Sequence, residues 1–194
     1  MALYHLEDNK DGSTLAIWEQ PNPVSRKEKR ENERNMEQNL LDTLFGPGRV
    51  LDHNPNGQPY IQNFPVNISI SHTNRFAVIL THPNKRVGVD VELLDRDFGS
   101  VEKRALSAKE SANLLQEKKS LQLAIIWSAK EAIYKLLSME GVDFSQQIEI
   151  EKFNPKRQGV VRALFLDKIG KKTEFIVKYQ TIDNHILTSI VKDF

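Results

Sequence analysis

Residues 121–137 restrict the fold more than any other part of the sequence. They are good helix formers with neither glycine nor proline among them, so they predict a long α-helix. At 100° per residue, six apolar side chains fall on one face of this helix: Leu123, Ile126, Trp127, Ile133, Tyr134 and Leu137. Because such a face has to be covered, we expect the helix to pack along its length against the core of the protein.

Lys130 lies in the middle of this apolar face, with apolar residues at all four i±3 and i±4 positions. A lysine here either extends its ammonium group to solvent or places it against a buried partner. Glu131 and Lys135 lie on the adjoining face, one turn apart. They are either an ordinary ion pair, worth about 0.2–0.5 kcal/mol, or part of a site that binds an anionic ligand together with a metal ion.

The residues on both sides of this helix have the patterns of β-strands. Residues 66–71 and 87–94 alternate apolar and polar side chains, whereas residues 76–80 are continuously apolar and predict a central strand. Further strands are expected at residues 15–18, 148–150, 160–166, 174–179 and 185–191. Helix and antiparallel-looking strands occur in both halves of the chain, so the predicted class is α+β.

Two further helices are predicted to begin at Ser-x-x-Glu sequences, which form capping boxes at helix N-termini. Ser25 opens a highly charged helix that ends before Gly46, and Ser107 opens a short helix to about Gln116. The basic residues of the charged helix are either a solvated face or contacts to phosphate.

Asp90 and Glu92 are two carboxylates on one face of the strand expected at residues 87–94. At positions i and i+2 they project from the same side, about 7 Å apart. On a solvated face they need no partner, whereas in an enclosed site their repulsion would raise a pKa unless a cation lay between them. Such oxygen ligands suit Mg²⁺ or Mn²⁺ together with phosphate oxygens. His72 is either a structural histidine with a hydrogen bond or a part of the same site.

A formal net charge of +1 and the absence of cysteine narrow the possible functions. Without bulk positive charge the chain is not expected to bind nucleic acid, and any anion site must be local. Disulfides, thiolate metal sites and cysteine nucleophiles are excluded. The sequence has no apolar run of membrane-spanning length and no signal peptide at residues 1–9, so we expect a cytoplasmic protein without a membrane partner.

Four motifs, in this order along the chain, resemble those of the 4'-phosphopantetheinyl transferase superfamily. Residues 56–59, Asn-Gly-Gln-Pro, resemble its Gly-Lys-Pro loop, and residues 69–73, Ser-Ile-Ser-His-Thr, resemble its Ser-His motif. Residues 87–92, Val-Gly-Val-Asp-Val-Glu, and residues 127–135, Trp-Ser-Ala-Lys-Glu-Ala-Ile-Tyr-Lys, resemble its paired signature. The lengths of chain outside these motifs are similar to those of the monomeric Sfp-like branch rather than the short trimeric one.

The resemblance implies two similar α+β halves, residues 1–94 and 95–194, related by a pseudo-two-fold axis. Each half would be a small antiparallel sheet packed with helices, and the active site would lie in the cleft between them. The implied enzyme is a monomer of the holo-[acyl-carrier-protein] synthase type that depends on Mg²⁺, with Mn²⁺ as a substitute. It would move the phosphopantetheine arm of coenzyme A onto a serine of an apo acyl or peptidyl carrier protein and release adenosine 3',5'-bisphosphate.

The resemblance also implies roles for the acidic residues. Asp90, Glu92 and Glu131 would be the metal ligands, and Asp90 would also face the coenzyme. Glu131 is a candidate for the base that takes the serine proton, and Glu110 is an alternative to it. Lys135 would share the catalytic role by neutralising charge on the pyrophosphate.

The same resemblance implies contacts to coenzyme A. Lys130 and Lys135 would hold the pyrophosphate, and Ser71 and His72 would contact phosphates as well. The adenine pocket would be lined by Gly57, Gln58 and Pro59, with only a backbone contact carried over for Gln58, which replaces the usual lysine. Because Gln38 replaces an arginine that binds the 3'-phosphate in many relatives, that contact is assigned to Arg26 or Arg30.

The carrier protein and the reaction both leave alternatives open. Carriers of fatty-acid, polyketide and peptide synthesis are all possible, and residues 93–122 are expected to form the docking surface. A non-catalytic relative that binds coenzyme A or carrier protein would be expected to lose an acidic or lysine position, and this chain keeps them all. The other alternative is a different metal-dependent phosphotransferase or phosphohydrolase that uses Asp90 and Glu92.

Overall fold

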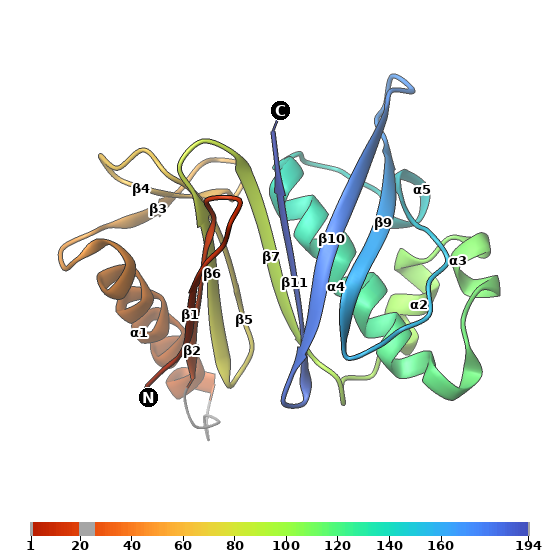
Figure 1. Cartoon of the computed structure of the whole chain (residues 1–194), viewed down its shortest axis with the longest axis horizontal. Helices are drawn as coiled ribbons and strands as arrows, with labels where there is room; N and C mark the ends of the chain where they lie inside the picture. Colours follow the sequence, from red (N-terminus) through yellow and green to blue (C-terminus); the bar gives the residue numbers. More distant parts are fainter. Residues whose placement is uncertain (1, 20–25, 194) are drawn as a thin grey trace.

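Two antiparallel sheets lie face to face at the centre of the protein, and each carries a long helix on its outer face (Figure 1). The computed structural model describes residues 2–19 and 26–193, and the side chains of all of these except residues 26, 27 and 29. The first sheet has the strand order β1 (Ala2–Asp8), β2 (Thr14–Glu19), β6 (Phe76–His82) and β5 (Asn67–His72). The predicted central strand at residues 76–80 is confirmed, since every residue of β6 is buried.

The second sheet contains the strand that carries the two predicted carboxylates. Its order is β7 (Arg86–Leu93), β11 (His185–Lys192), β10 (Lys172–Ile182), β9 (Gln158–Leu166) and β8 (Ile148–Ile150). A small ribbon of β3 (Leu51–His53) and β4 (Pro59–Ile61) lies apart from both sheets. The expected division of the chain after residue 94 counts β7 with the first half, whereas its hydrogen bonds to β11 join it to the second sheet.

Helix α1 (Arg26–Phe45) covers the outer face of the first sheet. Its charged first turns are followed by Met36, Leu40 and Leu41, which are buried against residues of the first sheet. The structure confirms the highly charged helix that was predicted to end before Gly46. Ser25, the predicted cap, lies outside the described residues.

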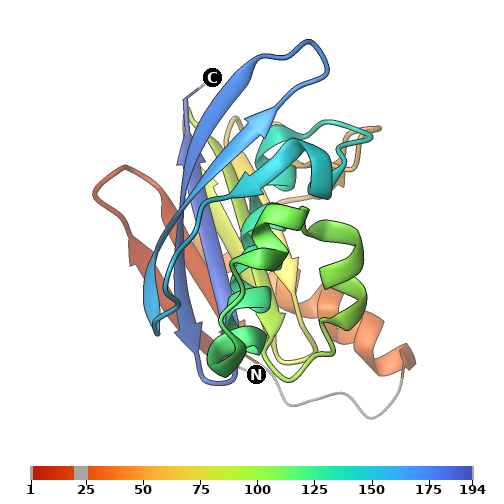
Figure 2. The ribbon, with the colours of Figure 1, turned by 90° about the vertical axis from the view of Figure 1, so that its right-hand side faces the viewer.

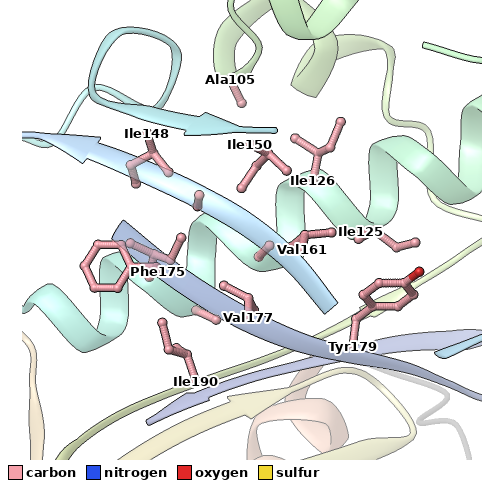
Figure 3. Packing of buried hydrophobic residues seen from close by; sticks show 14 of the residues in the cluster. Ala105, Ile125, Ile126, Ile148, Ile150, Val161, Phe175, Val177, Tyr179 and Ile190 are labelled. Carbon is pink, nitrogen blue, oxygen red and sulfur yellow. The ribbon is translucent and has the colours of Figure 1, made fainter. Parts of the chain in front are cut away.

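Helix α4 (Lys119–Leu137) fills the corresponding place on the second sheet and confirms the helix predicted at residues 121–137. Its apolar face forms the largest core cluster, in which side chains of α4 meet those of β8, β9 and β10 (Figure 3). Shorter helices flank it on the same side of the sheet (Figure 2). They are α2 (Gly99–Ala105), α3 (Ala108–Ala112), the 3-10 turn Gln116–Lys118 and α5 (Phe144–Gln147).

A second cluster fills the space between the two sheets. Val87, Val89 and Val91 of β7 point into it and meet apolar residues of β2 and β6, as the alternation of this strand predicts. The other face of β7 lies against α4. It approaches so closely at Gly88 that a Cβ atom there would lie 1.9 Å from the Ala132 carbonyl oxygen.

The α+β class and the small antiparallel sheets packed with helices agree with the prediction. The Ser107 capping box is also present, although its helix ends at Ala112 rather than near Gln116. Gln122 ends it there, because its side chain bonds to the backbone at Asn113 and Leu115. Within the described residues, six elements were not predicted: β1, β3, β4, α2, the 3-10 turn Gln116–Lys118 and α5. Over the described ranges, no helix is long and apolar enough to cross a membrane.

Candidate active site

Asp90 lies where β5, β7 and α4 meet, and it is only 4 % exposed. Its Oδ1 atom accepts hydrogen bonds from Ser71 Oγ at 2.8 Å and from Lys135 Nζ at 2.9 Å. Its Oδ2 atom is buried and has no partner among the described residues. Because a buried carboxylate oxygen is rarely left without a partner, Oδ2 is open to a ligand that the protein itself does not supply.

Ser69 and Ser71 join the two sheets at this point. Their hydroxyl groups accept hydrogen bonds from the backbone N–H groups of Val89 at 3.0 Å and Val91 at 3.2 Å. Ser71 therefore fixes both the backbone of β7 and the carboxylate of Asp90. The predicted contact between Ser71 and phosphate stays a prediction.

Glu131 projects from α4 towards the same place and is half-buried. Burial, and then the neighbouring charge of Asp90, raise the pKa of Glu131 to about 7, and Glu92 adds to this rise. Lys135 and Arg96 oppose it. Glu131 is therefore a carboxyl group that can gain or lose a proton near neutral pH, as a general base must.

Glu92 is held by two donors on one oxygen. Trp127 Nε1 and Arg96 Nη1 donate to Glu92 Oε1 over 2.7 Å and 2.6 Å. The sequence pattern gave neither donor a role, because Trp127 fits an apolar helix face and Arg96 lies in the turn after β7.

These groups fit a divalent cation. Three carboxylates, of Asp90, Glu92 and Glu131, share this place with two basic side chains, Lys135 and Arg96. With its pKa raised to about 7, Glu131 binds a proton near neutral pH. A hard cation could replace that proton and bind the free oxygen of Asp90. No group of three acidic or histidine side chains is already drawn together as a metal site within the described residues.

Two hollows open beside this cluster. The large hollow has a volume of about 1020 Å³, and its lining includes Asp90, Glu92, Arg96 and Glu131. The small hollow has a volume of about 200 Å³, and Lys135 is part of its lining. His72 lines both hollows, so the two hollows adjoin at this residue.

The small hollow also contains the predicted adenine loop. It is lined by Gly57, Gln58 and Pro59 and by the apolar side chains of Ile68, Ile70, Tyr134 and Met139. Asn56 fixes this loop, because its Nδ2 atom donates to the backbone oxygen and to Oγ of Ser138 at the end of α4, each at 3.0 Å. The loop of the first half is thus tied to the helix of the second.

His72 faces two carboxylates of α1. Its Nε2 atom lies 3.3 Å from Glu33 Oε1, and its Nδ1 atom lies 3.9 Å from Glu37 Oε1. Burial raises the pKa of Glu37, and the nearby His72 partly offsets that rise. Arg30 is an exposed residue of α1, and the side chain of Arg26 lies outside the described residues.

Lys130 is not brought to this site. Its side chain is fully buried, and its ammonium group donates to Glu110 Oε2 at 2.8 Å and to the carbonyl oxygens of Ala105 and Phe144 at 2.7 and 2.9 Å. With all three donors used inside the protein, this geometry gives no support to the predicted contact between Lys130 and pyrophosphate. Of the two possibilities for this lysine, the buried partner is the one observed.

Glu110 is committed to the same buried group. Besides Lys130 it accepts hydrogen bonds from the backbone N–H groups of Ser107 and Ile150, at 2.7 and 2.8 Å. It lies in the lining of neither hollow described above. Glu131 is therefore the better placed of the two candidate bases.

Comparison with known protein families identifies a match for the second half of the chain. A family model described as the 4'-phosphopantetheinyl transferase superfamily matches residues 86–189, which is more than half of the chain. The matched residues run from β7 almost to the end of β11, so they include Asp90, Glu92, Glu131 and Lys135. No curated protein matches the chain.

Proposed function

Because the chain belongs to the 4'-phosphopantetheinyl transferase superfamily, we propose that it moves the phosphopantetheine arm of coenzyme A onto a serine of an apo acyl or peptidyl carrier protein. The observation that supports this most strongly is the Oδ2 atom of buried Asp90, which has no partner among the described residues. It lies beside Glu131, whose pKa is raised to about 7. A phosphoryl-transfer site needs such a place for a cation next to a group that can take a proton.

In the proposed reaction, the serine oxygen of the carrier attacks the phosphorus that bears the pantetheine arm. The bond from this phosphorus to the oxygen of the leaving adenosine 3',5'-bisphosphate breaks, and the serine proton goes to the Glu131 carboxylate. Glu131 lines the large hollow beside Asp90, so its carboxylate is placed to accept this proton.

The cationic and hydroxyl groups around Asp90 orient the phosphates. Lys135 borders the small hollow while it holds Asp90, so its ammonium group is placed to bind a pyrophosphate oxygen that enters from there. His72 and Ser71 line the large hollow, and His72 lines the small hollow as well. A Mg²⁺ or Mn²⁺ ion held by Asp90, Glu92 and Glu131 would neutralise the charge that develops on the phosphates.

The two hollows suggest how the substrates divide between them. The small hollow, with its apolar walls and the loop of residues 57–59, suits the adenine end of coenzyme A. The large hollow is bordered by Arg96 and Leu93 and suits the reacting phosphate and the serine of the carrier. Residues 93–122 follow directly from its rim, and we propose them as the carrier-docking surface.

The proposal also includes the branch of the family, the division of the chain into halves and the location of the protein. We assign the chain to the monomeric Sfp-like branch, with residues 1–94 and 95–194 as its two halves and a cytoplasmic location. Lys130 is left out of the proposed ligand contacts, because its ammonium group is fully used in the buried pair with Glu110.

Intact-mass spectrometry of apo carrier proteins tests the proposal. A panel of fatty-acid, polyketide and peptide-synthesis carriers is incubated with the protein, coenzyme A and Mg²⁺, with EDTA in a parallel sample. The expected result is a gain of one phosphopantetheine on at least one carrier that EDTA abolishes. Measurable binding of coenzyme A without transfer to any carrier would instead support a binding protein.

A further inference from the structure

We propose that Trp127 and Arg96 are positioning residues that hold one oxygen of Glu92 and so aim the other oxygen at the divalent cation. The inference rests on the proposed function, in which Glu92 is a metal ligand. It gives a role to Trp127, the first residue of the motif at 127–135, and to Arg96, which lies outside the four motifs.

Both donors converge on a single carboxylate oxygen. Trp127 Nε1 lies 2.7 Å from Glu92 Oε1, and Arg96 Nη1 lies 2.6 Å from the same atom. Because the acceptor is a charged carboxylate, both hydrogen bonds are stronger than hydrogen bonds between neutral groups. With Oε1 committed to two donors, Oε2 is the oxygen that remains for a ligand.

The indole ring is held in place independently of Glu92. Its centre lies 5.6 Å from that of the Phe144 ring, and the guanidinium carbon of Arg96 lies 5.6 Å from the same indole centre. Arg96 also lies 5.8 Å from the centre of the Phe98 ring. The donors are thus held by ring contacts with Phe144 of α5 and with Phe98, which directly precedes α2. The flexible glutamate takes its orientation from them.

Holding the Glu92 side chain in place should strengthen the binding of the cation. A free glutamate side chain loses rotamer freedom when it binds an ion, and a carboxylate already held in place avoids much of that loss. Removing a hydrogen-bond partner of a metal-ligating carboxylate typically lowers metal affinity by about 10- to 100-fold. Arg96 adds a second effect, because its charge helps to offset the repulsion among Asp90, Glu92 and Glu131.

The two tryptophans of the chain provide a matched pair of variants. Trp127→Phe removes the N–H donor and keeps a ring to pack on Phe144. Trp18→Phe is the control, because Trp18 Nε1 is buried without a hydrogen-bond partner in the described part of the chain. Both variants lose one indole N–H, but only the first loses a bond to Glu92.

The test measures metal binding directly. Mn²⁺ binding is followed by electron paramagnetic resonance, with and without coenzyme A, for the wild type and both variants. We expect Trp127→Phe to bind Mn²⁺ about tenfold more weakly and Trp18→Phe to bind it as the wild type does. In ¹H–¹⁵N spectra of the wild type, Mg²⁺ should shift the indole signal of Trp127 and leave that of Trp18 in place.

Equal Mn²⁺ affinity of the wild type and Trp127→Phe would overturn the inference. If that variant does not fold, the spectra of the wild type decide, and an unmoved Trp127 signal at saturating Mg²⁺ would also overturn it. Metal-dependent transfer that survives with unchanged affinity in Trp127→Phe would refute this inference alone. Absence of both metal binding and transfer in the wild type would refute the proposed function as well.

Discussion

Lys135 Nζ donates to Asp90 Oδ1 over 2.9 Å, and the other oxygen of the same carboxylate has no partner among the described residues. The lysine also donates to the carbonyl oxygen of Val89, so it is held at two points of β7. This arrangement fixes the orientation of Asp90, while its Oδ2 atom remains available. Glu131 lies one helical turn before Lys135 and completes the site.

Replacing Lys135 with Met should lower kcat/KM for coenzyme A by at least about 100-fold, because a charged donor to the reacting phosphates is lost. This kcat/KM is measured from the steady-state release of adenosine 3',5'-bisphosphate. Lys171→Met in the exposed turn after β9 is the control and should leave the rate unchanged. A Lys135→Met enzyme within about threefold of wild type would remove this residue from the mechanism.

Glu131→Gln should change how stability depends on pH. The pKa of Glu131 is raised from 4.5 to about 7 in the folded protein, so the folded state holds this proton more tightly than the unfolded state. The associated stability is fully present below pH 4.5 and is lost as the pH rises through about 7. The wild type should therefore lose roughly 3 kcal/mol over this window from this group, and Glu131→Gln should not.

Urea unfolding at several pH values measures this difference. Glu140→Gln, at an exposed position beyond α4, is the control and should follow the wild type. If the free energy of unfolding changes with pH equally in the wild type and in Glu131→Gln, the pKa of Glu131 is not raised in the folded protein.

Lys130→Met should destabilise the fold by about 3–5 kcal/mol, because it leaves the buried Glu110 carboxylate without its counter-charge. The double variant Lys130→Met/Glu110→Gln should recover part of this loss, since the remaining group is neutral. Thermal and urea unfolding measure both. Unchanged stability together with a large loss of coenzyme A binding would return Lys130 to the pyrophosphate site.

Gly88→Ala should lower stability by about 1–3 kcal/mol and reduce activity, because its Cβ would meet the Ala132 carbonyl oxygen at 1.9 Å and push α4 away from β7. Gly99→Ala is the control, since its Cβ would meet only the end of the Asp97 side chain, at 3.1 Å. A Gly88→Ala protein with wild-type stability and activity would show that the spacing of α4 and β7 is not critical.

The long elements could be predicted from sequence because their patterns are local. The apolar stripe of α4 and the alternation along β7 each specify which face is buried, and both are observed. Strand β1 was not predicted, because its side chains are mostly exposed on both faces and its order depends on pairing with β2. The short strands β3 and β4 likewise depend on contacts made between them.

The sequence predicted the charged residues of the site but not the partners that hold them. The sequence left the Lys130 ammonium group either in solvent or against a buried partner. Its partner Glu110 is 20 residues away and meets it only in the folded protein. The bonds of Trp127 and Arg96 to Glu92 likewise arise from packing between α4 and the turn after β7. Helical and strand periods assign residues to faces, and they do not determine which faces meet.

The most direct test of the account compares the wild type with Asp90→Asn in the transfer of phosphopantetheine to one apo carrier, followed by intact mass in the presence of Mg²⁺. The amide keeps the size of the carboxylate and removes its charge. We predict transfer by the wild type and a loss of at least about 1000-fold in Asp90→Asn with its fold retained. Transfer by Asp90→Asn within about tenfold of the wild type would contradict the central claim that Asp90 holds the cation.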